Sequence, residues 1–408
     1  MTTSKSVKPV FIELFAGVGG FRLALEKAGW AHGWSNQWEP STKAQHASSC
    51  YIRNFGSDNH SCEDIAEVVQ RMRSTREIPV ADLLVGGFPC QDYSVAKSLS
   101  SARGLEGKKG VLWWEILKIA EYRKPKVILL ENVDRLLSSP SGQRGRDFAV
   151  MLRTLADLGY FVEWRVINSA DYGFPQRRKR VFVFAHKKPL KSFEAHPMGT
   201  LINSTFKILS HGPIVEFKLH EDASQISNKF GIGAKQSQFQ NWGVFDGKTV
   251  FTAKVEPKTK NPSTLGDVLI PTNQVPKEFW VDKYELTQWE FLKGSKSLER
   301  TTREGFTYNY SEGKMTYPDA LDKPSRTILT GEGGKTPSRF KHIIASGKRM
   351  RRLTPVELER LSGFPDDWTK FGDDGIALPD ARRAFFIGNA LVVGVVERLG
   401  KQILKEFF

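Results

Sequence analysis

The chain has 408 residues, which allows one large domain or two ordinary ones, and its apolar content of 40% is normal for a globular protein. Its formal net charge of +15 predicts a polyanionic partner, nucleic acid first and an anionic membrane second, although a merely soluble basic protein has the same balance. Cys50, Cys62 and Cys90 lack regular spacing, which argues against a disulfide framework and a zinc site. No apolar run approaches the ~20 residues of a membrane span, so we expect a cytosolic protein without a bound metal.

Residues 8–186 alternate short apolar runs with helical patterns. We expect strands at residues 9–15, 81–87, 126–132 and 180–186, and helices at residues 21–29, 63–73, 112–124 and 148–159. Strand–helix alternation of this kind predicts an α/β fold, with a doubly wound, mostly parallel sheet and helices on both faces.

A glycine-rich turn, FAGVGG, lies between the first strand and the first helix. Gly17, Gly19 and Gly20 let the backbone turn tightly and approach a ligand near the N-terminus of the helix. A dinucleotide fingerprint requires a small residue where this chain has Arg22, so the turn favours a smaller nucleoside; a purely structural turn is the alternative. The next strand ends near SNQWEP, where a polar side chain would bind ribose hydroxyls and Trp38 would cover an adenine ring or pack in the core.

Cys90 follows a predicted strand at the edge of the sheet where open α/β folds bind ligands. Cysteine is most often a small buried hydrophobe, but Pro89 before it and polar residues after it make burial less favourable. Glu131 ends another strand, where a carboxylate costs free energy unless it is used in chemistry or caps a turn. A thiolate and a carboxyl at neighbouring strand tips beside a nucleoside site predict covalent catalysis on a heterocycle. The arginines of residues 176–180 supply the positive charge that a nucleophilic thiolate needs.

The composition changes after residue 187. Residues 187–342 contain scattered Pro, Gly, Ser, Asn and Lys with weak periodicity, and aromatic residues lie among the lysines. The aromatic residues predict a second, smaller, irregular domain rather than disorder; a loop-rich extension of the first domain is the alternative. Regular patterns return at a helix that Thr354 caps and Pro355 begins, and the chain ends in an apolar helix after a Gly-Asn break.

Six motifs in this order resemble the DNA (cytosine-5)-methyltransferases. They are FAGVGG, GFPCQDYS, ENV, DYGFPQRRKRVF, RRLTPVELERLSGFPDDW and GNALVV. The resemblance implies a Rossmann-like class I methyltransferase fold. Residues 1–186 and 343–408 would form the catalytic domain that binds S-adenosylmethionine, and residues 187–342 the DNA target-recognition domain.

The resemblance also implies a mechanism that agrees with the chemistry expected from the residues. The target cytosine is flipped out of the duplex, Cys90 attacks C6 of the ring, and Glu131 holds N3 and the exocyclic amine. C5 then takes the methyl group of S-adenosylmethionine, which leaves S-adenosylhomocysteine. Arg178 and Arg180 would hold the cytosine O2 and the catalytic centre, and Pro89 would shape the loop that carries the thiol.

The implied cofactor pocket combines the glycine turn, the tip of the second strand and three later segments. Its residues are Phe15, Gly17, Gly19, Gly20, Gln37, Trp38, Asp64, Ile65, Leu112 and Asn389. One position departs from the family pattern, because Gln37 replaces the usual ribose-binding glutamate and bonds a hydroxyl more weakly than a carboxylate does. Glu39 is the alternative ribose ligand.

The implied DNA contacts come from the segment after Cys90 and from the second domain. They are Gln91, Ser94, Thr264, Arg326, Thr327, Arg339 and Lys341. Residues 335–352 hold seven Lys and Arg and no acid, which predicts salt-dependent phosphate contacts or, alternatively, a solvated basic loop.

The expected partner is double-stranded DNA rather than a membrane, and the expected protein is a monomer of the bacterial cytosol that protects host DNA beside a restriction or phage-defence system. Three other functions stay open. An RNA cytosine methyltransferase of the same family is disfavoured by the long second domain, which duplex base readout requires. A catalytically silent DNA-binding relative is disfavoured by Cys90, Glu131 and Arg178, and a nicotinamide oxidoreductase by Arg22.

Overall fold

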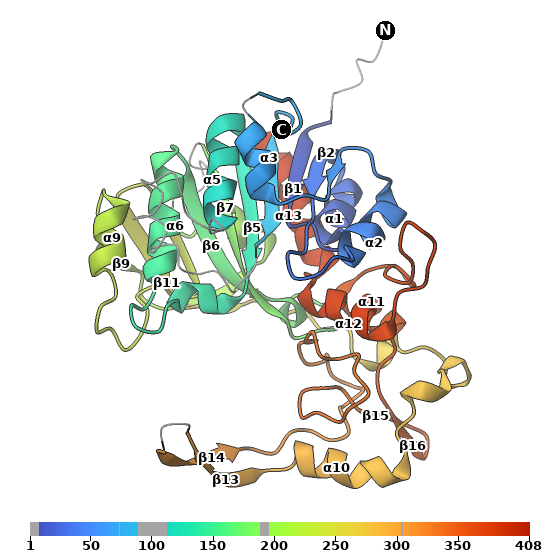
Figure 1. Ribbon diagram of the computed structural model, residues 1–408. Helices are drawn as coiled ribbons and strands as arrows, with labels where there is room; N and C mark the ends of the chain where they lie inside the picture. Colours follow the sequence, from blue (N-terminus) through green and yellow to red (C-terminus); the bar gives the residue numbers. More distant parts are fainter. Residues whose placement is uncertain (1–7, 73, 89–111, 188–195, 303–304) are drawn as a thin grey trace.

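The computed structural model describes residues 8–72, 74–88, 112–187, 196–302 and 305–408 of the chain. Its centre is a ten-stranded sheet with the strand order β3-β2-β1-β4-β5-β7-β6-β10-β11-β9 (Figure 1). The first half of the sheet is parallel and consists of β1 (Val10–Leu14), β2 (Ala31–Asn36), β3 (His60–Ser61), β4 (Leu83–Gly87) and β5 (Val127–Asn132). These strands and the helices between them confirm the predicted α/β fold.

The second half of the sheet is antiparallel and consists of β6 (Phe161–Asn168), β7 (Lys179–His186), β9 (Val215–Lys218), β10 (Trp242–Phe245) and β11 (Thr249–Ala253). The predicted strand at residues 180–186 forms β7, but it runs antiparallel to β5 because strand β6, and not a helix, precedes it. Strands β9, β10 and β11 come from residues 187–342, so the central sheet continues beyond residue 186. The proposed domain boundary stays a prediction.

Helices cover both faces of the sheet because successive side chains of a strand point to opposite sides. Ile12 and Leu84 pack on the face that α3, α5 and α6 cover, whereas Phe11 and Leu83 pack on the face of α1 and α13. The helices are α1 (Gly20–Ala28), α2 (His46–Phe55), α3 (Ile65–Arg71), α5 (Leu112–Arg123), α6 (Arg146–Asp157), α8 (Leu201–Thr205), α9 (Ala223–Lys229), α10 (Lys283–Lys293), α11 (Pro355–Ser362), α12 (Asp380–Asn389) and α13 (Val393–Phe407).

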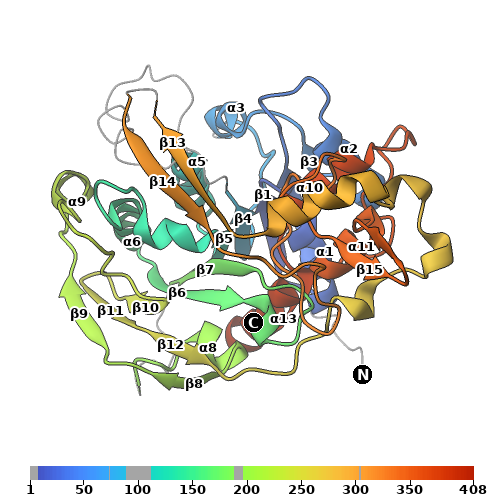
Figure 2. The ribbon, with the colours of Figure 1, turned by 90° about the horizontal axis from the view of Figure 1, so that it is seen from below.

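Residues 271–352 form a second module. It contains α10, a hairpin of β13 (Lys296–Thr301) and β14 (Thr307–Glu312), and a short hairpin of β15 (Ile344–Ser346) and β16 (Arg349–Arg351). A small core that includes Trp289 holds it together. Figure 1 shows α10 and the β13–β14 hairpin below the sheet, and Figure 2, seen from below, shows them in front of it. Strands β8 (Ile208–His211) and β12 (Val255–Pro257) form a separate pair.

The C-terminal helices return the chain to the sheet. The predicted cap of α11 is confirmed, since the Thr354 hydroxyl accepts the amide of Glu357 and the Glu357 carboxylate accepts the amide of Thr354 at 2.8 Å. The predicted final helix is confirmed as α13, but Gly388 and Asn389 are the last residues of α12, so the break between the two helices is formed by residues 390–392. Helix α13 packs along α1. Leu391, in this break, lies within van der Waals reach of Gly20, so the end of the chain lies against the glycine turn.

Candidate active site

The glycine turn follows β1 and contains three left-handed residues, with φ of 55° at Phe15, 56° at Gly17 and 84° at Gly19. The glycines serve different purposes. A β-carbon on Gly19 would overlap the Phe55 ring, whereas one on Gly17 would meet no atom within 4 Å. Gly17 therefore exposes its backbone to open space, which is what the close approach of a ligand requires. A non-glycine residue in the left-handed region, here Phe15, is often found at functional sites.

The Gln37 side chain supports this turn. Its Oε1 accepts a hydrogen bond from the amide of Gly17 at 2.7 Å, and the residue is 9% exposed. The other candidate ribose ligand, Glu39, is engaged elsewhere: its Oε2 accepts the amide of Ala47 in α2 at 3.3 Å. Gln37 thus lies against the predicted nucleoside site, and the carboxylate of Glu39 is directed toward the start of α2.

The remaining predicted cofactor residues lie around the same edge of the sheet. The amide of Gln37 donates to the carbonyl of Ser61 in β3 at 3.0 Å, which places the tip of β2 beside the segment that contains Asp64 and Ile65. Asp64 caps α3 by accepting the amide of Ala66 at 3.0 Å. The other positions are the half-buried Trp38 after β2, the partly buried Leu112 at the start of α5 and the exposed Asn389 at the end of α12.

Glu131 lies at the tip of β5, next to the tip of β4. It pairs with Gly87, and a β-carbon on Gly87 would lie 3.3 Å from the Glu131 carboxylate, so glycine keeps this space open. The next residue, Asn132, donates its side-chain amide to the carbonyl of Phe88 at 2.9 Å. Phe88 directly precedes Pro89 and Cys90. The structure therefore brings the start of the predicted nucleophile segment beside Glu131, while Pro89, Cys90, Gln91 and Ser94 themselves lie outside the described residues.

Two arginines of β7 and its preceding loop have different surroundings. The Nε of Arg180 lies 2.9 Å from Oε1 of Glu131, with both side chains partly accessible. Arg178 is buried, and its guanidinium donates to the carbonyls of Ile328 at 3.2 Å and Gly388 at 3.0 Å. Burial and the like charge of Arg180 lower the pKa of Arg178. Arg180 is thus the arginine in contact with the predicted catalytic carboxyl. Arg178 instead joins its own loop to the segments that contain Ile328 and Gly388.

Sequence reasoning missed two buried polar residues that support this edge. Gln176 is fully buried; its carbonyl oxygen accepts the amide of Ile328 at 3.1 Å, and its amide donates to the Ser362 hydroxyl at 3.2 Å. Glu13, in the middle of β1, is also fully buried, and burial raises its pKa to about 8. A lone carboxylate between apolar Ile12 and Leu14 was the signal in the sequence that could have identified Glu13.

The predicted DNA-contact residues of the second domain have internal partners. Arg326 forms an ion pair with Asp319 at 2.8 Å, and the buried Lys341 donates to the carbonyls of Gly334 and Thr336. Arg339 lies 3.1 Å from Glu312, and the Thr327 hydroxyl donates to the carbonyl of Arg177 at 2.6 Å. The backbone amide of Thr264 is bound by Asp267 at 2.7 Å. Arg326, Arg339 and Lys341 thus bind other parts of the protein. Contact of the predicted residues with DNA stays a prediction.

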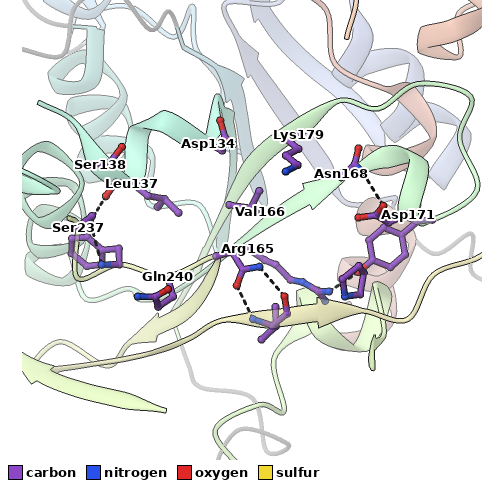
Figure 3. Close-up of a pocket in the computed structure, with 15 residues that line it drawn as sticks. Asp134, Leu137, Ser138, Arg165, Val166, Asn168, Asp171, Lys179, Ser237 and Gln240 are labelled. Carbon is purple, nitrogen blue, oxygen red and sulfur yellow. Dashed lines mark hydrogen bonds between the residues drawn. The ribbon is translucent and has the colours of Figure 1, made fainter. Parts of the chain in front are cut away.

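A cavity of about 440 Å³ lies between β6, β7 and the loops around β12 (Figure 3). Asp134 and Lys179 are among its lining residues, and the buried Arg165 donates to the hydroxyl of Tyr172 beside it. Of the predicted catalytic and cofactor residues that the structure describes, none lines this cavity. It is therefore a hollow beside the candidate active site and not part of it.

Within the described residues, no group of three or more His, Cys, Asp and Glu side chains is placed to hold a metal ion. In the same part of the chain, every helix is too short or too polar to cross a bilayer.

The model of the family described as C-5 cytosine-specific DNA methylase matches residues 10–405. The chain is 44% identical to type II methyltransferase M.Sau3AI of Staphylococcus aureus, over 97% of this chain and 95% of that protein. It is 36% identical to type II methyltransferase M.HhaI of Haemophilus parahaemolyticus, over 96% and 93% of the two chains.

Solved structures of low sequence identity share the fold. The methyltransferase EhMeth of Entamoeba histolytica aligns with a TM-score of 0.57 at 16% identity, over 99% of this chain and all of that one. The Dnmt2 methyltransferase of S. pombe aligns with a TM-score of 0.58 at 14% identity, over 98% and 100% of the two chains. These likenesses confirm the class I methyltransferase fold. The family match over residues 10–405 and the two relatives above show that this chain belongs to the C-5 cytosine-specific DNA methylases.

Proposed function

We propose that the chain methylates C5 of a cytosine in a short sequence of duplex DNA, with S-adenosylmethionine as methyl donor and Cys90 as nucleophile. The observation that carries this proposal is the meeting of the β4 and β5 tips. Glu131 pairs with Gly87 and lies 2.9 Å from Arg180, and Asn132 binds the carbonyl of Phe88, two residues before Cys90. A carboxyl and a cation thus flank the start of the segment that carries the thiol.

The cofactor fits the edge that the glycine turn builds. Gly17 leaves open space above a left-handed backbone, Gln37 supplies a polar side chain beside it, and the half-buried Trp38 presents an aromatic ring at the next strand tip. When bound, S-adenosylmethionine supplies an electrophilic methyl group on a sulfonium. The chain's contribution is to hold the nucleoside against the turn and to exclude groups that need a bulkier pyrophosphate site.

The reaction at the base requires that the ring be made nucleophilic. The Cys90 thiolate forms a bond to C6, and the electron pair of the C5–C6 double bond becomes available at C5, which then accepts the methyl group. Glu131 holds N3 and the exocyclic amine and stabilises the charge that develops there, and Arg180 keeps the Glu131 carboxyl in place. Loss of the C5 proton and cleavage of the carbon–sulfur bond restore the aromatic ring. Base flipping exposes C6, which is unreachable inside the stack.

The experiment that tests this proposal is base-resolution sequencing of 5-methylcytosine in DNA from cells that express the protein. We expect methylation confined to one short motif and abolished by Cys90→Ala. The matched control is Cys62→Ala, since the Cys62 thiol has only a distant contact, 3.9 Å from Gln45. Methylation that persists in Cys90→Ala would show that another nucleophile acts.

The biological setting is part of the same proposal. We infer that the protein is a cytosolic monomer that protects host DNA beside a restriction or phage-defence system. The two relatives named above are type II methyltransferases, which supports this role. Competition between duplex DNA and transfer RNA as substrates checks the nucleic-acid class, and loss of host viability on removal of the methyltransferase alone checks the protective role.

A further inference from the structure

One face of the β13–β14 hairpin has no partner among the residues that the structure describes. The two strands pair antiparallel from Lys296↔Glu312 to Thr301↔Thr307, so residues of alternate positions share a face. One face carries Leu298, Arg300, Tyr308 and Tyr310. The opposite face carries only polar residues, all of them exposed: Ser297, Glu299, Thr301, Thr307, Asn309 and Ser311.

The contacts of the hairpin concentrate on the other face and at its base. Arg300 stacks on the Tyr310 ring at 3.8 Å, and the Tyr310 hydroxyl donates to Glu312 at 2.7 Å. Glu312 in turn lies 3.1 Å from Arg339, which ties the hairpin to the second module. Among the described residues, the side chains of the polar face make no hydrogen bond or ion pair except the one between Thr301 and Thr307, at 3.2 Å. A two-stranded hairpin is at best marginally stable by itself. The exposed polar face contributes no packing that would stabilise this one.

The hairpin lies on the same side of the molecule as the candidate active site. The second module is joined to the chain at the carboxyl edge of β5, where Gln176 binds Ile328 and Arg178 bridges Ile328 and Gly388. Figures 1 and 2 show the hairpin extending from the end of α10 below this edge of the sheet. The hairpin therefore lies on the side of the sheet at which the tip of β5 carries Glu131.

The charge of the second module suits DNA. Residues 271–352 contain 16 Lys and Arg against 10 Asp and Glu, a formal net charge of +6. Although Arg326, Arg339 and Lys341 are used internally, Lys314, Lys348 and Arg349 are exposed. These exposed cations are available for phosphates, and phosphate contacts position a duplex without reading its sequence.

We propose that the β13–β14 hairpin enters the major groove of the substrate and that Glu299 and Asn309 on its polar face read base edges. This inference rests on the proposed function. The major groove admits a two-stranded β-ribbon, and its base edges match the side chains on this face. Asparagine pairs with the N6 and N7 of adenine, glutamate accepts from the N4 of cytosine, and serine or threonine bonds either kind of edge. Glu299 and Asn309 are directly opposite each other in the ladder, so they lie over neighbouring bases.

The test compares Glu299→Ala and Asn309→Ala with the wild type by base-resolution sequencing after methylation of a randomised duplex library. We expect each substitution to lower kcat/KM at the preferred motif roughly 10- to 100-fold and to relax the motif at one base pair. The matched control is Glu216→Ala, the same change at an exposed position of the edge strand β9. Unchanged S-adenosylhomocysteine affinity and unchanged Tm verify that the variants are folded.

The outcomes separate this inference from the proposed function. If the wild type methylates a motif that both variants methylate equally well, the hairpin does not read bases and the inference is overturned. If the variants weaken binding equally at all sequences and reduce only the salt dependence, the hairpin contacts phosphates, which also overturns it. If the wild type itself forms no 5-methylcytosine on any duplex, the proposed function fails and the inference falls with it.

Discussion

At the scale of single residues, Glu13 is a carboxyl that the fold withdraws completely from water. It lies in β1, two residues before Phe15, and is fully buried. Burial raises its pKa to about 8, although the charge of Arg22 and the amides of Phe21 and Arg22 act in the opposite direction. Its carboxyl is therefore mostly protonated at neutral pH in the folded protein and ionised in the unfolded chain. A neutral acid beneath the glycine turn links the stability of that turn to pH.

We predict that Glu13 makes the folded protein less stable as the pH rises. Its folded pKa is raised, so its stabilising effect is complete below pH 4.5 and is lost as the pH rises to about 8. Between pH 6.5 and 8 the loss should be on the order of 1–2 kcal/mol. Urea unfolding at the two pH values, for the wild type and Glu13→Gln, measures it.

The Glu13→Gln variant should show a smaller pH dependence than the wild type, because an amide stays neutral throughout. Burial also raises the pKa of Glu163 to about 7, so this second carboxyl keeps part of the loss. Burial lowers the pKa of His32 to about 3 and that of His60 to about 4, so their opposite contribution appears only as the pH falls below about 6.5, outside this window. An equal loss of stability in wild type and variant would show that another group is responsible.

At the scale of elements, the start of β7 carries one arginine of the candidate active site and follows another that joins distant segments. Arg180, at its start, contacts Glu131, whereas Arg178, just before it, binds the carbonyls of Ile328 and Gly388. Arg178 and Arg180 are only two positions apart in the sequence. One arginine is partly accessible at the candidate active site, and the other is a buried link between β7, the second module and α12.

We predict that replacing Arg178 by methionine mainly affects stability, whereas replacing Arg180 by methionine mainly affects activity. Arg178→Met leaves two carbonyls without a charged donor and should lower the free energy of unfolding by about 2–4 kcal/mol. Arg180→Met should lower kcat at least tenfold with a much smaller effect on stability, because its ion pair is partly solvated. Denaturant unfolding and single-turnover kinetics measure the two effects. Equal losses of stability in both variants would contradict this division of roles.

At the scale of the whole molecule, the basic residues behind the net charge of +15 differ in their surroundings, since some have internal partners and others face solvent. Basic residues of the stretch 335–352 that the sequence marks as phosphate contacts have internal partners, as Arg339, Lys341 and Arg351 illustrate. Lys348 and Arg349, at the turn between β15 and β16, are exposed to solvent. Electrostatic attraction to DNA therefore depends on where each cation is placed and not on their number.

We predict that DNA binding weakens with salt and that Lys348 and Arg349 account for part of the slope. Replacing both by alanine should reduce the slope of log K against log salt by about 2 and leave the methylated motif unchanged. Lys341→Ala should instead lower Tm, since the buried Lys341 side chain binds two loop carbonyls with its ammonium. Fluorescence anisotropy over a salt series measures the slope. A slope unchanged in the Lys348–Arg349 variant would contradict the prediction.

Local patterns allowed much of the parallel half of the fold to be predicted. The strands at residues 9–15, 81–87 and 126–132 are confirmed as β1, β4 and β5, because a buried parallel strand is a short apolar run that ends at a turn residue. The cap of α11 is confirmed for the same local reason. The sequence alone also determined the motif order that the family match confirms, and it marked the glycine turn and Glu131 as strand-tip features.

Only the tertiary structure decided how distant segments meet. The antiparallel half of the sheet was not predicted, because β9, β10 and β11 are short strands that join the sheet only through the pairing of β10 with β6, far away in the chain. The same holds for charged side chains: the sequence shows that Arg178, Arg326 and Lys341 carry charge, but their partners lie 5 to 210 residues away. Secondary structure depends mainly on neighbours in the sequence. The partner of a charged side chain depends on which carbonyl, carboxylate or solvent the fold brings beside it.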